Sequence, residues 1–170
     1  MALNDPFDGD GLGDVLIIDP QIFGRKRMTA MVAEIGCDCT VDIDNLSDAL
    51  VALAARRFDL MLIDRRLGLP AIGCLIRALR QATEPKFRNM TAMLSTDRVD
   101  RDQVRSAGAL GFDGIVVTPC TARILNDRID AAGAIWNRRF SSASRARRLY
   151  GTLDERQRQP PARLLHLPAR

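Results

Sequence analysis

The stretch SAGALGFDGIVVTP, residues 106–119, decides the fold. Its first part, through Gly111, completes a helical segment that begins near residue 99, and its second part belongs to an apolar run at 112–120. Apolar residues at helical spacing, followed directly by a short apolar run, predict a helix that leads into a buried strand. The chain therefore changes from one kind of secondary structure to the other at this point.

The same alternation extends through the preceding sequence. Residues 14–20 (DVLIIDP) and 58–66 (FDLMLIDRR) are continuous apolar runs with an aspartate at the end, which is typical of strands buried on both faces. Residues 37–44 alternate apolar and polar side chains, as an edge strand does. The other predicted elements are a strand at 89–97 and helices at 22–36, 46–57 and 71–82.

A final helix is predicted to open near Thr121. Helical spacing places its apolar residues on one face, namely Ile124, Leu125, Ile129, Ala132, Ile135 and Trp136.

Five strands that alternate with five helices predict an α/β fold with a five-stranded, parallel, doubly wound sheet between two helical layers. In such sheets, ligands and reacting groups gather at the carboxyl ends of the strands. Here those ends carry Asp19, Asp64, the pair Ser95-Thr96, and Thr118.

The last part of the chain has a different composition. Residues 134–170 hold nine arginines, no lysine and two acids, which gives +7, while residues 1–133 sum to −3. Guanidinium is a planar fork that binds phosphate and the guanine O6/N7 edge in bidentate fashion and stacks on flat rings. An arginine-only extension therefore indicates recognition that depends on geometry as well as charge.

These observations divide the chain into a disordered acidic lead-in (1–13), a domain (14–133) and a flexible arginine-rich extension (134–170). The apolar runs of the whole chain are far shorter than the ~20 residues that a bilayer span needs. We therefore expect a cytoplasmic protein with no membrane contact. Cys37, Cys39, Cys74 and Cys120 are expected to be buried or half-buried free thiols. With a single histidine in the extension, they do not assemble a zinc site.

Residues 14–133 resemble a response-regulator receiver domain of the CheY-like, flavodoxin-like kind. The marks are Asp19, Asp64 and Ser95 at three strand ends, the stretch 106–119, and the proline that follows the last strand. The resemblance implies that Asp64 stands at the phosphoacceptor position and Asp19 at the first of two adjacent acidic positions that hold Mg²⁺. It also implies that Ser95 is the phosphate-binding hydroxyl. Thr118 stands at the position where the family has a lysine that binds the phosphate.

The sequence departs from this pattern at three positions. Pro20 replaces the second acid, Thr118 replaces the lysine, and Ile115 replaces the aromatic switch residue. Two carboxylates hold Mg²⁺ less well than three, and the missing lysine removes a charge-assisted hydrogen bond of roughly 1.5–3 kcal/mol. We therefore expect a degenerate receiver that does not rely on phosphorylation, needs no cofactor, is not an enzyme and holds at most a weak Mg²⁺ at Asp19 and Asp64. Arg65 and Arg66 follow Asp64 directly. They either supply part of the positive charge that the missing lysine would give, or face solvent.

The extension suits a ligand that carries two guanines and two phosphates. Arginine binds phosphates and the O6/N7 edge of guanine, rings stack on the base, and Asp154 can accept from the N1/N2 edge. Cyclic di-GMP has all of these groups. The segment RRLYGTLDERQRQPPAR, residues 147–163, also resembles the arginine-rich extension of the Cle proteins, a CheY-like subclass. That resemblance implies binding of cyclic di-GMP, as a single molecule or an intercalated dimer, and docking of the receiver body on the flagellar motor switch.

The roles assigned by residue type fall into three groups. Guanine edges or stacking are assigned to Arg145, Arg148 and Arg156, with Asp154 on the N1/N2 edge. Phosphates are assigned to Arg138, Arg139, Arg147 and Arg158. Stacking platforms are assigned to Trp136 and Tyr150, although Trp136 is equally suited to closing the end of the core.

The functional hypothesis is a cyclic di-GMP effector that modulates motility and surface attachment, with recruitment to the flagellated pole. One alternative is a single-domain regulator switched by phosphorylation. Another is an adaptor whose basic arm binds nucleic acid. A basic arm that binds nucleic acid by releasing counterions from the phosphates would work equally well with lysine. Because the extension has arginine alone, nucleic acid is the less favoured partner.

Overall fold

Five parallel strands form the centre of the structure, in the order β2-β1-β3-β4-β5. The computed structural model describes residues 12–37 and 39–133. The strands are β1 (Asp14–Ile18), β2 (Cys39–Ile43), β3 (Leu60–Asp64), β4 (Thr91–Thr96) and β5 (Gly114–Val117). This order and the parallel pairing of all neighbours confirm the predicted α/β fold class.

Helices connect consecutive strands. They are α1 (Ile22–Ile35), α2 (Leu46–Ala55), the short 3-10 helix η1 (Arg65–Leu67), α3 (Leu69–Gln81), α4 (Pro85–Arg88) and α5 (Arg101–Leu110). A further helix covers residues 122–133 at the end of the described chain.

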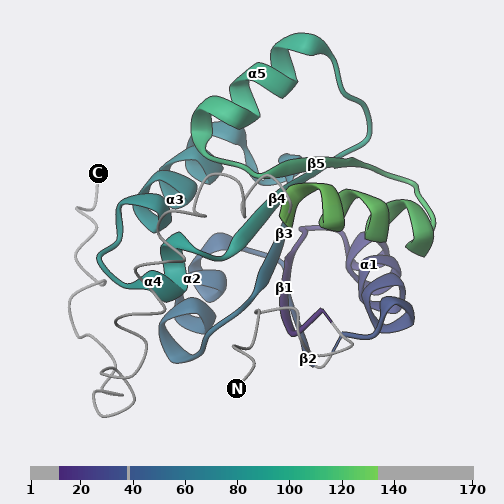
Figure 1. Cartoon of the computed structure of the whole chain (residues 1–170), viewed down its shortest axis with the longest axis horizontal. Coiled ribbons are helices and arrows are strands. Elements are labelled where there is room, and N and C mark those ends of the chain that lie inside the picture. The colour runs from purple at the N-terminus through teal and green to yellow at the C-terminus, as the bar shows by residue number, and fades with distance from the viewer. Residues whose placement is uncertain (1–11, 38, 134–170) are drawn as a thin grey trace, which may run out of the picture.

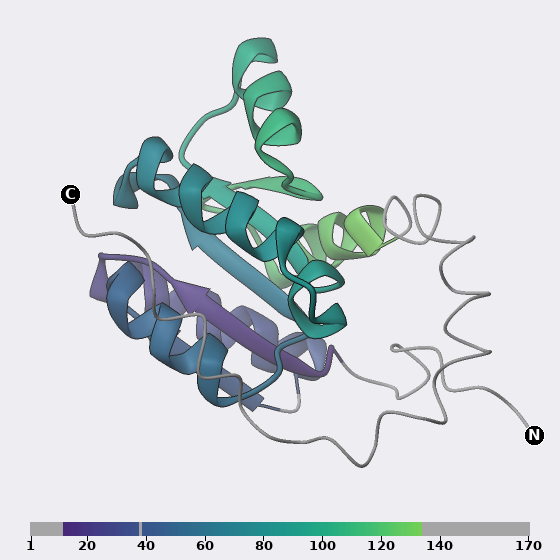
Figure 2. The same ribbon diagram turned by 90° about the vertical axis from the view of Figure 1, so that its left-hand side faces the viewer.

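The helices cover the sheet in two layers. Figure 1 shows α1 and the helix at 122–133 together on one side of the strands, with α2, α3 and α4 on the other, and Figure 2 shows the same arrangement after a quarter turn. The buried residues agree, because Met28 and Leu125 belong to one apolar cluster while Leu53 and Ile76 belong to the other.

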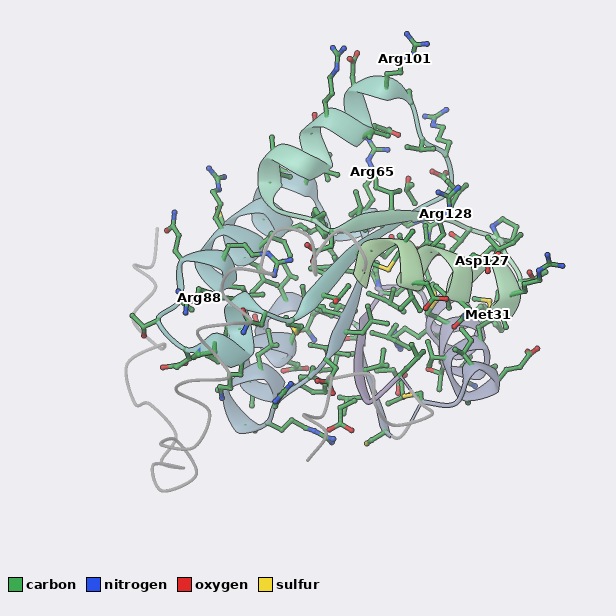
Figure 3. The ribbon with its side chains drawn as sticks, viewed as in Figure 1. Met31, Arg65, Arg88, Arg101, Asp127 and Arg128 are labelled. Atoms are coloured by element: carbon green, nitrogen blue, oxygen red, sulfur yellow. The ribbon has the colours of Figure 1, made fainter. Side chains whose placement is uncertain are left out.

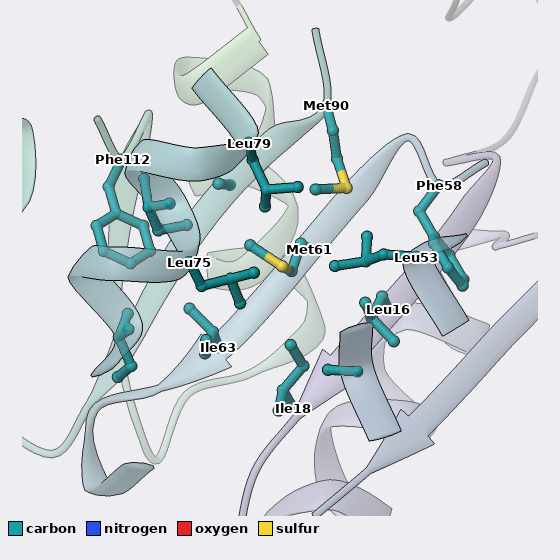
Figure 4. Packing of buried hydrophobic residues seen from close by; sticks show 14 of the residues in the cluster. Leu16, Ile18, Leu53, Phe58, Met61, Ile63, Leu75, Leu79, Met90 and Phe112 are labelled. Carbon is teal, nitrogen blue, oxygen red and sulfur yellow. The ribbon is translucent and has the colours of Figure 1, made fainter. Parts of the chain in front are cut away.

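Strand alternation produces these two clusters. Leu16, Ile18, Met61 and Ile63 face the layer that includes α2 and α3, where they meet Phe58 and Phe112, as Figure 4 shows. The residues between them in sequence face α1 and the helix at 122–133. Burying one such side chain contributes about 1.5–3 kcal/mol, so the two clusters hold the helices against the sheet.

Local signals fix where several helices begin and end. Asp100 and Gln103 form a reciprocal capping box at the start of α5. Asn45 caps α2 by accepting from the Asp48 N–H. Gly36 ends α1 and Gly111 ends α5 in the left-handed region, at φ 98° and 101°, where a residue with a Cβ is strained.

Some predictions made from the sequence need correction. The four-residue helix α4 was not predicted. Cys74 is exposed, because it lies on the outer face of α3. Ile124 is also exposed, with 48% of its surface accessible, whereas Leu125 and Ile129 of the same helix are buried. Leu12, which we assigned to the lead-in, is buried and its N–H donates to the carbonyl of Gly36.

Candidate functional site

Polar residues meet at the carboxyl ends of the central strands. Asp19 follows β1, Asp64 ends β3, and Ser95 and Thr96 end β4. Asp64 is the register partner of Ser95, and Thr96 is the partner of Val117, one residue before Thr118. Parallel pairing thus brings the four strand ends to one edge of the sheet, as the sequence predicts.

Asp64 is 3% exposed, and both of its carboxylate oxygens contact Arg66. Oδ1 accepts from the Arg66 backbone N–H at 2.8 Å, which caps the 3-10 helix η1, and Oδ2 lies 3.3 Å from the Arg66 guanidinium. The Arg66 side chain therefore turns toward the carboxylate, although 43% of its surface remains exposed.

Burial is the main influence on the pKa of Asp64, and it raises that pKa above the usual value for aspartate. The negative charges of Asp19 and Asp97 act in the same direction. The hydrogen bond from the Arg66 N–H and the charge of Arg66 oppose the shift without cancelling it. Asp64 is thus a desolvated carboxyl whose principal stabilising partner is Arg66.

Asp19 is tied to the beginning of α1. Its Oδ1 accepts from the Gln21 N–H at 2.7 Å, and its carbonyl accepts from the Arg25 guanidinium at 2.7 Å. Gly24 leaves room for this carboxylate, because a Cβ at Gly24 would overlap Asp19 Oδ2. The second acidic position is Pro20, which carries no ligand atom.

The hydroxyl that faces the pocket beside Asp64 is Thr96 rather than Ser95. Successive residues of a strand point to opposite faces, and Thr96 lines this pocket whereas Ser95 does not. The Thr96 hydroxyl donates to the carbonyl of Arg98 at 2.8 Å. Ser95, which the resemblance assigns as the phosphate-binding hydroxyl, is the register partner of Asp64, so this assignment stays a prediction.

Thr118 stands beside Thr96. Its N–H donates to the Thr96 carbonyl at 2.8 Å, and its hydroxyl lies 3.3 Å from the same oxygen. It offers no positive charge to the edge of the sheet. Ile115 packs against the cluster of α2 and α3 as a partly buried side chain.

An open pocket of about 330 Å³ lies beside Asp64. It is lined by Asp64, Arg65, Arg66, Leu69, Thr96, Asp97 and Arg98. Asp97 and Arg98 were not predicted as site residues, because no sequence pattern in the β4–α5 connection indicates which of its side chains face the strand ends.

The arrangement does not suit Mg²⁺. This ion prefers near-octahedral oxygen coordination with carboxylate charge, yet Arg66 engages both oxygens of Asp64 and Asp19 serves the start of α1. Within residues 12–37 and 39–133, no three His, Cys, Asp or Glu side chains are grouped to hold a metal ion. The binding residues predicted in the extension, from Trp136 to Arg158, lie outside the described residues.

Sheet order and strand pairing define the class: the described part of the chain has the fold of a CheY-like receiver domain. By sequence the chain is related to proteins named CheY. It is 28% identical over 117 residues to the chemotaxis protein CheY of Pseudomonas aeruginosa, a match that covers 68% of this chain and 92% of that protein. It is 25% identical to the chemotaxis protein CheY-3 of Vibrio cholerae, over 68% of this chain and 88% of that protein.

Solved structures support the same fold. The chemotaxis response regulator CheY4 of Vibrio cholerae matches with a TM-score of 0.62 at 17% identity, over 71% of this chain and 98% of that chain. A response regulator from Thermotoga maritima matches with a TM-score of 0.61 at 17% identity, over 71% and 96%. No family model matches the sequence.

None of the helices in the described part of the chain is long and apolar enough to cross a membrane.

Proposed function

We propose that this chain is a non-enzymatic receiver-fold effector that responds to cyclic di-GMP instead of to phosphorylation of Asp64. In this proposal residues 134–170 bind the ligand, and the receiver body docks on the flagellar motor switch to modulate motility and surface attachment. The observation that carries the proposal is the contact of both Asp64 oxygens with Arg66.

That contact opposes phosphoryl transfer to Asp64. A carboxylate that attacks phosphorus needs a free oxygen and a cation that neutralises the incoming phosphoryl group. Here Arg66 engages both oxygens, Pro20 supplies no carboxylate for a metal ion, and Thr118 supplies no charge. A receiver with these features needs another input.

The composition of residues 134–170 supports cyclic di-GMP as that input. Nine arginines without a lysine suit bidentate binding of phosphates and guanine edges. Asp154 suits the N1/N2 edge of guanine, and Trp136 and Tyr150 suit stacking. Together with the receiver fold, these residues match the organisation of the Cle proteins.

The relatives support a role in motility. The relatives from Pseudomonas aeruginosa and Vibrio cholerae are both named chemotaxis proteins. We extend it to this chain as a proposal, with the flagellar motor switch as the docking partner and the cytoplasm, including the flagellated pole, as the site of action.

Calorimetry on the full chain tests ligand binding. Cyclic di-GMP is expected to bind with a dissociation constant of about 1 μM or less, whereas GMP and a short oligonucleotide bind much more weakly. Arg148→Ala and Asp154→Ala should each weaken binding about tenfold or more. Arg163→Ala is the matched control, since Arg163 lies in the same segment but has no assigned contact.

Two outcomes would contradict this proposal. One is equal, salt-sensitive binding of the oligonucleotide, which would indicate a general polyanion arm. The other is an unchanged affinity in both Arg148→Ala and Asp154→Ala.

A regulator switched by phosphorylation is the second candidate. It is favoured by the burial of Asp64 at the end of β3 and by the similarity to CheY proteins. Beryllofluoride with Mg²⁺ would then shift the amide signals of Asp64 and Thr96. Our proposal predicts that these signals stay in place, because the Arg66 contact occupies the carboxylate.

A further inference from the structure

The outer face of α2 is apolar at positions where a surface helix usually carries polar side chains. The side of α2 that faces the core carries Ala49 and Leu53, which are buried. Val51 lies on the opposite side of the helix and is 65% exposed, and its neighbour Leu50 is 37% exposed. Ala55, one turn after Val51, is also exposed. This side of α2 therefore offers apolar surface to a partner.

Acidic side chains lie beside this apolar surface. Asp44 and Asp48 are exposed, and the side-chain amide of Asn45 donates to both carboxylates, at 2.7 and 2.8 Å. Asn45 thereby holds two negative charges together at the start of α2. Neither carboxylate has a salt-bridge partner among the residues that the structure describes. We use the name α2 face for Asp44, Asp48, Leu50, Val51 and Ala55.

The sequence around the α2 face is acidic over a long stretch. Residues 28–55 hold five acids and neither lysine nor arginine, which gives −5. Arg56 and Arg57, which follow, each pair with an aspartate. Exposed arginines are found on other helices, and Figure 3 labels Arg101 on α5 and Arg128 on the last described helix. The negative charge around β2 and α2 thus favours a cationic partner.

The same chain carries a segment of complementary chemistry. Residues 156–170 hold four arginines and no acid. Between the last two of these arginines stand three leucines, Leu164, Leu165 and Leu167. These leucines have no assigned contact with cyclic di-GMP, so that ligand does not explain them. A segment that is both apolar and cationic matches a face that is both apolar and acidic.

The length of the extension allows this segment to reach α2. Residues 134–163 separate Gly133, the last described residue, from Leu164. A fully extended chain of this length spans up to about 100 Å, whereas a compact domain of this size is roughly 35 Å across. A segment tethered to the same chain also meets the surface at a roughly millimolar effective concentration. Weak contacts are therefore enough to hold it there.

We propose that the α2 face is the docking surface for residues 164–170 of the same chain. Leucine side chains of this segment cover Val51 and Leu50, and arginine side chains of the extension pair with Asp44 and Asp48. Apolar burial supplies most of the free energy, because exposed ion pairs contribute little. The contact forms without cyclic di-GMP, and the proposal does not depend on the function proposed above.

Methyl NMR of the full chain without ligand tests this contact directly. With ¹³C-labelled leucine and valine methyl groups, we expect nuclear Overhauser effects at low ionic strength between Val51 and Leu164, Leu165 or Leu167. These effects should persist on dilution, because the contact lies within one chain. They should weaken at an ionic strength of about 0.5 M, because salt screens the attraction between arginine and aspartate.

The amide signal of Ala55 reports the ratio of docked to undocked chains. The undocked reference is the triple variant Leu164→Ser, Leu165→Ser, Leu167→Ser, made in the full chain. We expect this variant to shift the Ala55 signal and to leave the signals of β3 in place.

Substitutions on α2 make the test specific. Val51→Ser should lower the ratio of docked to undocked chains about fivefold, because part of a buried side chain is lost. Asp48→Asn should lower it about twofold, as expected for one exposed ion pair. The controls on α5 are Val104→Ser and Asp102→Asn, which should leave the ratio unchanged. Val104 is 54% exposed, and Asp102 lies in the first turn of α5 as Asp48 does in α2.

Three results would overturn the proposal. The first is the absence of these Overhauser effects in the full chain at low ionic strength. The second is an effect that disappears on dilution, which would assign the α2 face to a second copy of the chain. The third is an Ala55 signal that the triple variant leaves in place. Well-dispersed amide signals verify that each variant is folded, and none of these results bears on the binding of cyclic di-GMP.

Discussion

Arg80 is the residue whose loss should damage the receiver fold most, although it is charged. From α3 its guanidinium donates to the carbonyls of Gly111, Arg88 and Met90 at 2.9, 2.8 and 2.7 Å, and to the carboxylate of Asp113 at 2.5 Å. It thus joins α3 to the end of α4, the start of β4 and the α5–β5 connection.

The magnitude follows from the burial of Asp113. This side chain is 3% exposed, and without Arg80 its remaining hydrogen-bond donor is the Ala92 N–H. Leaving a buried charge without its partner typically costs 3–5 kcal/mol. Arg80→Met keeps most of the apolar volume, so we expect a loss of about 3–5 kcal/mol in the free energy of unfolding. This loss is a large part of the roughly 5–15 kcal/mol available to a domain.

Urea denaturation followed by circular dichroism measures this loss. With a slope of about 2 kcal/mol/M, the midpoint should fall by roughly 2 M. Arg77→Met is the control on the same helix, because Arg77 is exposed and its guanidinium bonds only to the Gly73 carbonyl one turn earlier. That variant should lie within about 0.5 kcal/mol of the parent. A loss below about 1 kcal/mol in Arg80→Met would refute the reasoning.

Two further predictions concern the strand-end carboxylates. Burial raises the pKa of Asp64, so its ionised form is disfavoured in the folded state. Asp64→Asn should therefore stabilise the fold at neutral pH, with a gain that is small below about pH 4 and grows as the pH rises through the folded pKa. Urea midpoints between pH 4 and 8 measure this gain, and a less stable variant at pH 7 would contradict it. Gly24→Ala should destabilise by roughly 1–3 kcal/mol because its Cβ displaces the Asp19 carboxylate. Gly108→Ala, in open space within α5, should stabilise by about 0.5–1 kcal/mol. Thermal denaturation compares the two, and shifts of the same sign would contradict the packing described at Asp19.

The sequence predicts the sheet well because its central strands are short apolar runs bounded by polar residues. The apolar runs at 14–20 and 58–66 predicted strands buried on both faces, and they contain the buried strands β1 and β3. The helix α4 is four residues long, too short to show a helical period. Helical spacing also placed Ile124 on the buried face, but the stripe that packs is narrower and passes through Leu125 and Ile129.

The candidate site was predictable only in part. Topology alone brings Asp19, Asp64 and Thr118 to one edge, and the sequence names them correctly as strand-end residues. The sequence could not say which of two adjacent hydroxyl residues lines the pocket, and in the structure it is Thr96, while Ser95 is the register partner of Asp64. The contact of Arg66 with Asp64 depends on the conformation of η1. Sequence reasoning had left Arg66 with two possible orientations.

The most direct test of the central claim compares the full chain with a chain that ends at Gly133, which retains the buried Ile129 and Ala132. Binding of cyclic di-GMP is measured by calorimetry for both, after each shows a cooperative thermal transition. If signal input has moved away from Asp64 to residues 134–170, the full chain binds at about 1 μM or tighter and the shorter chain shows no heat of binding. Equal affinity in the two chains would contradict the account.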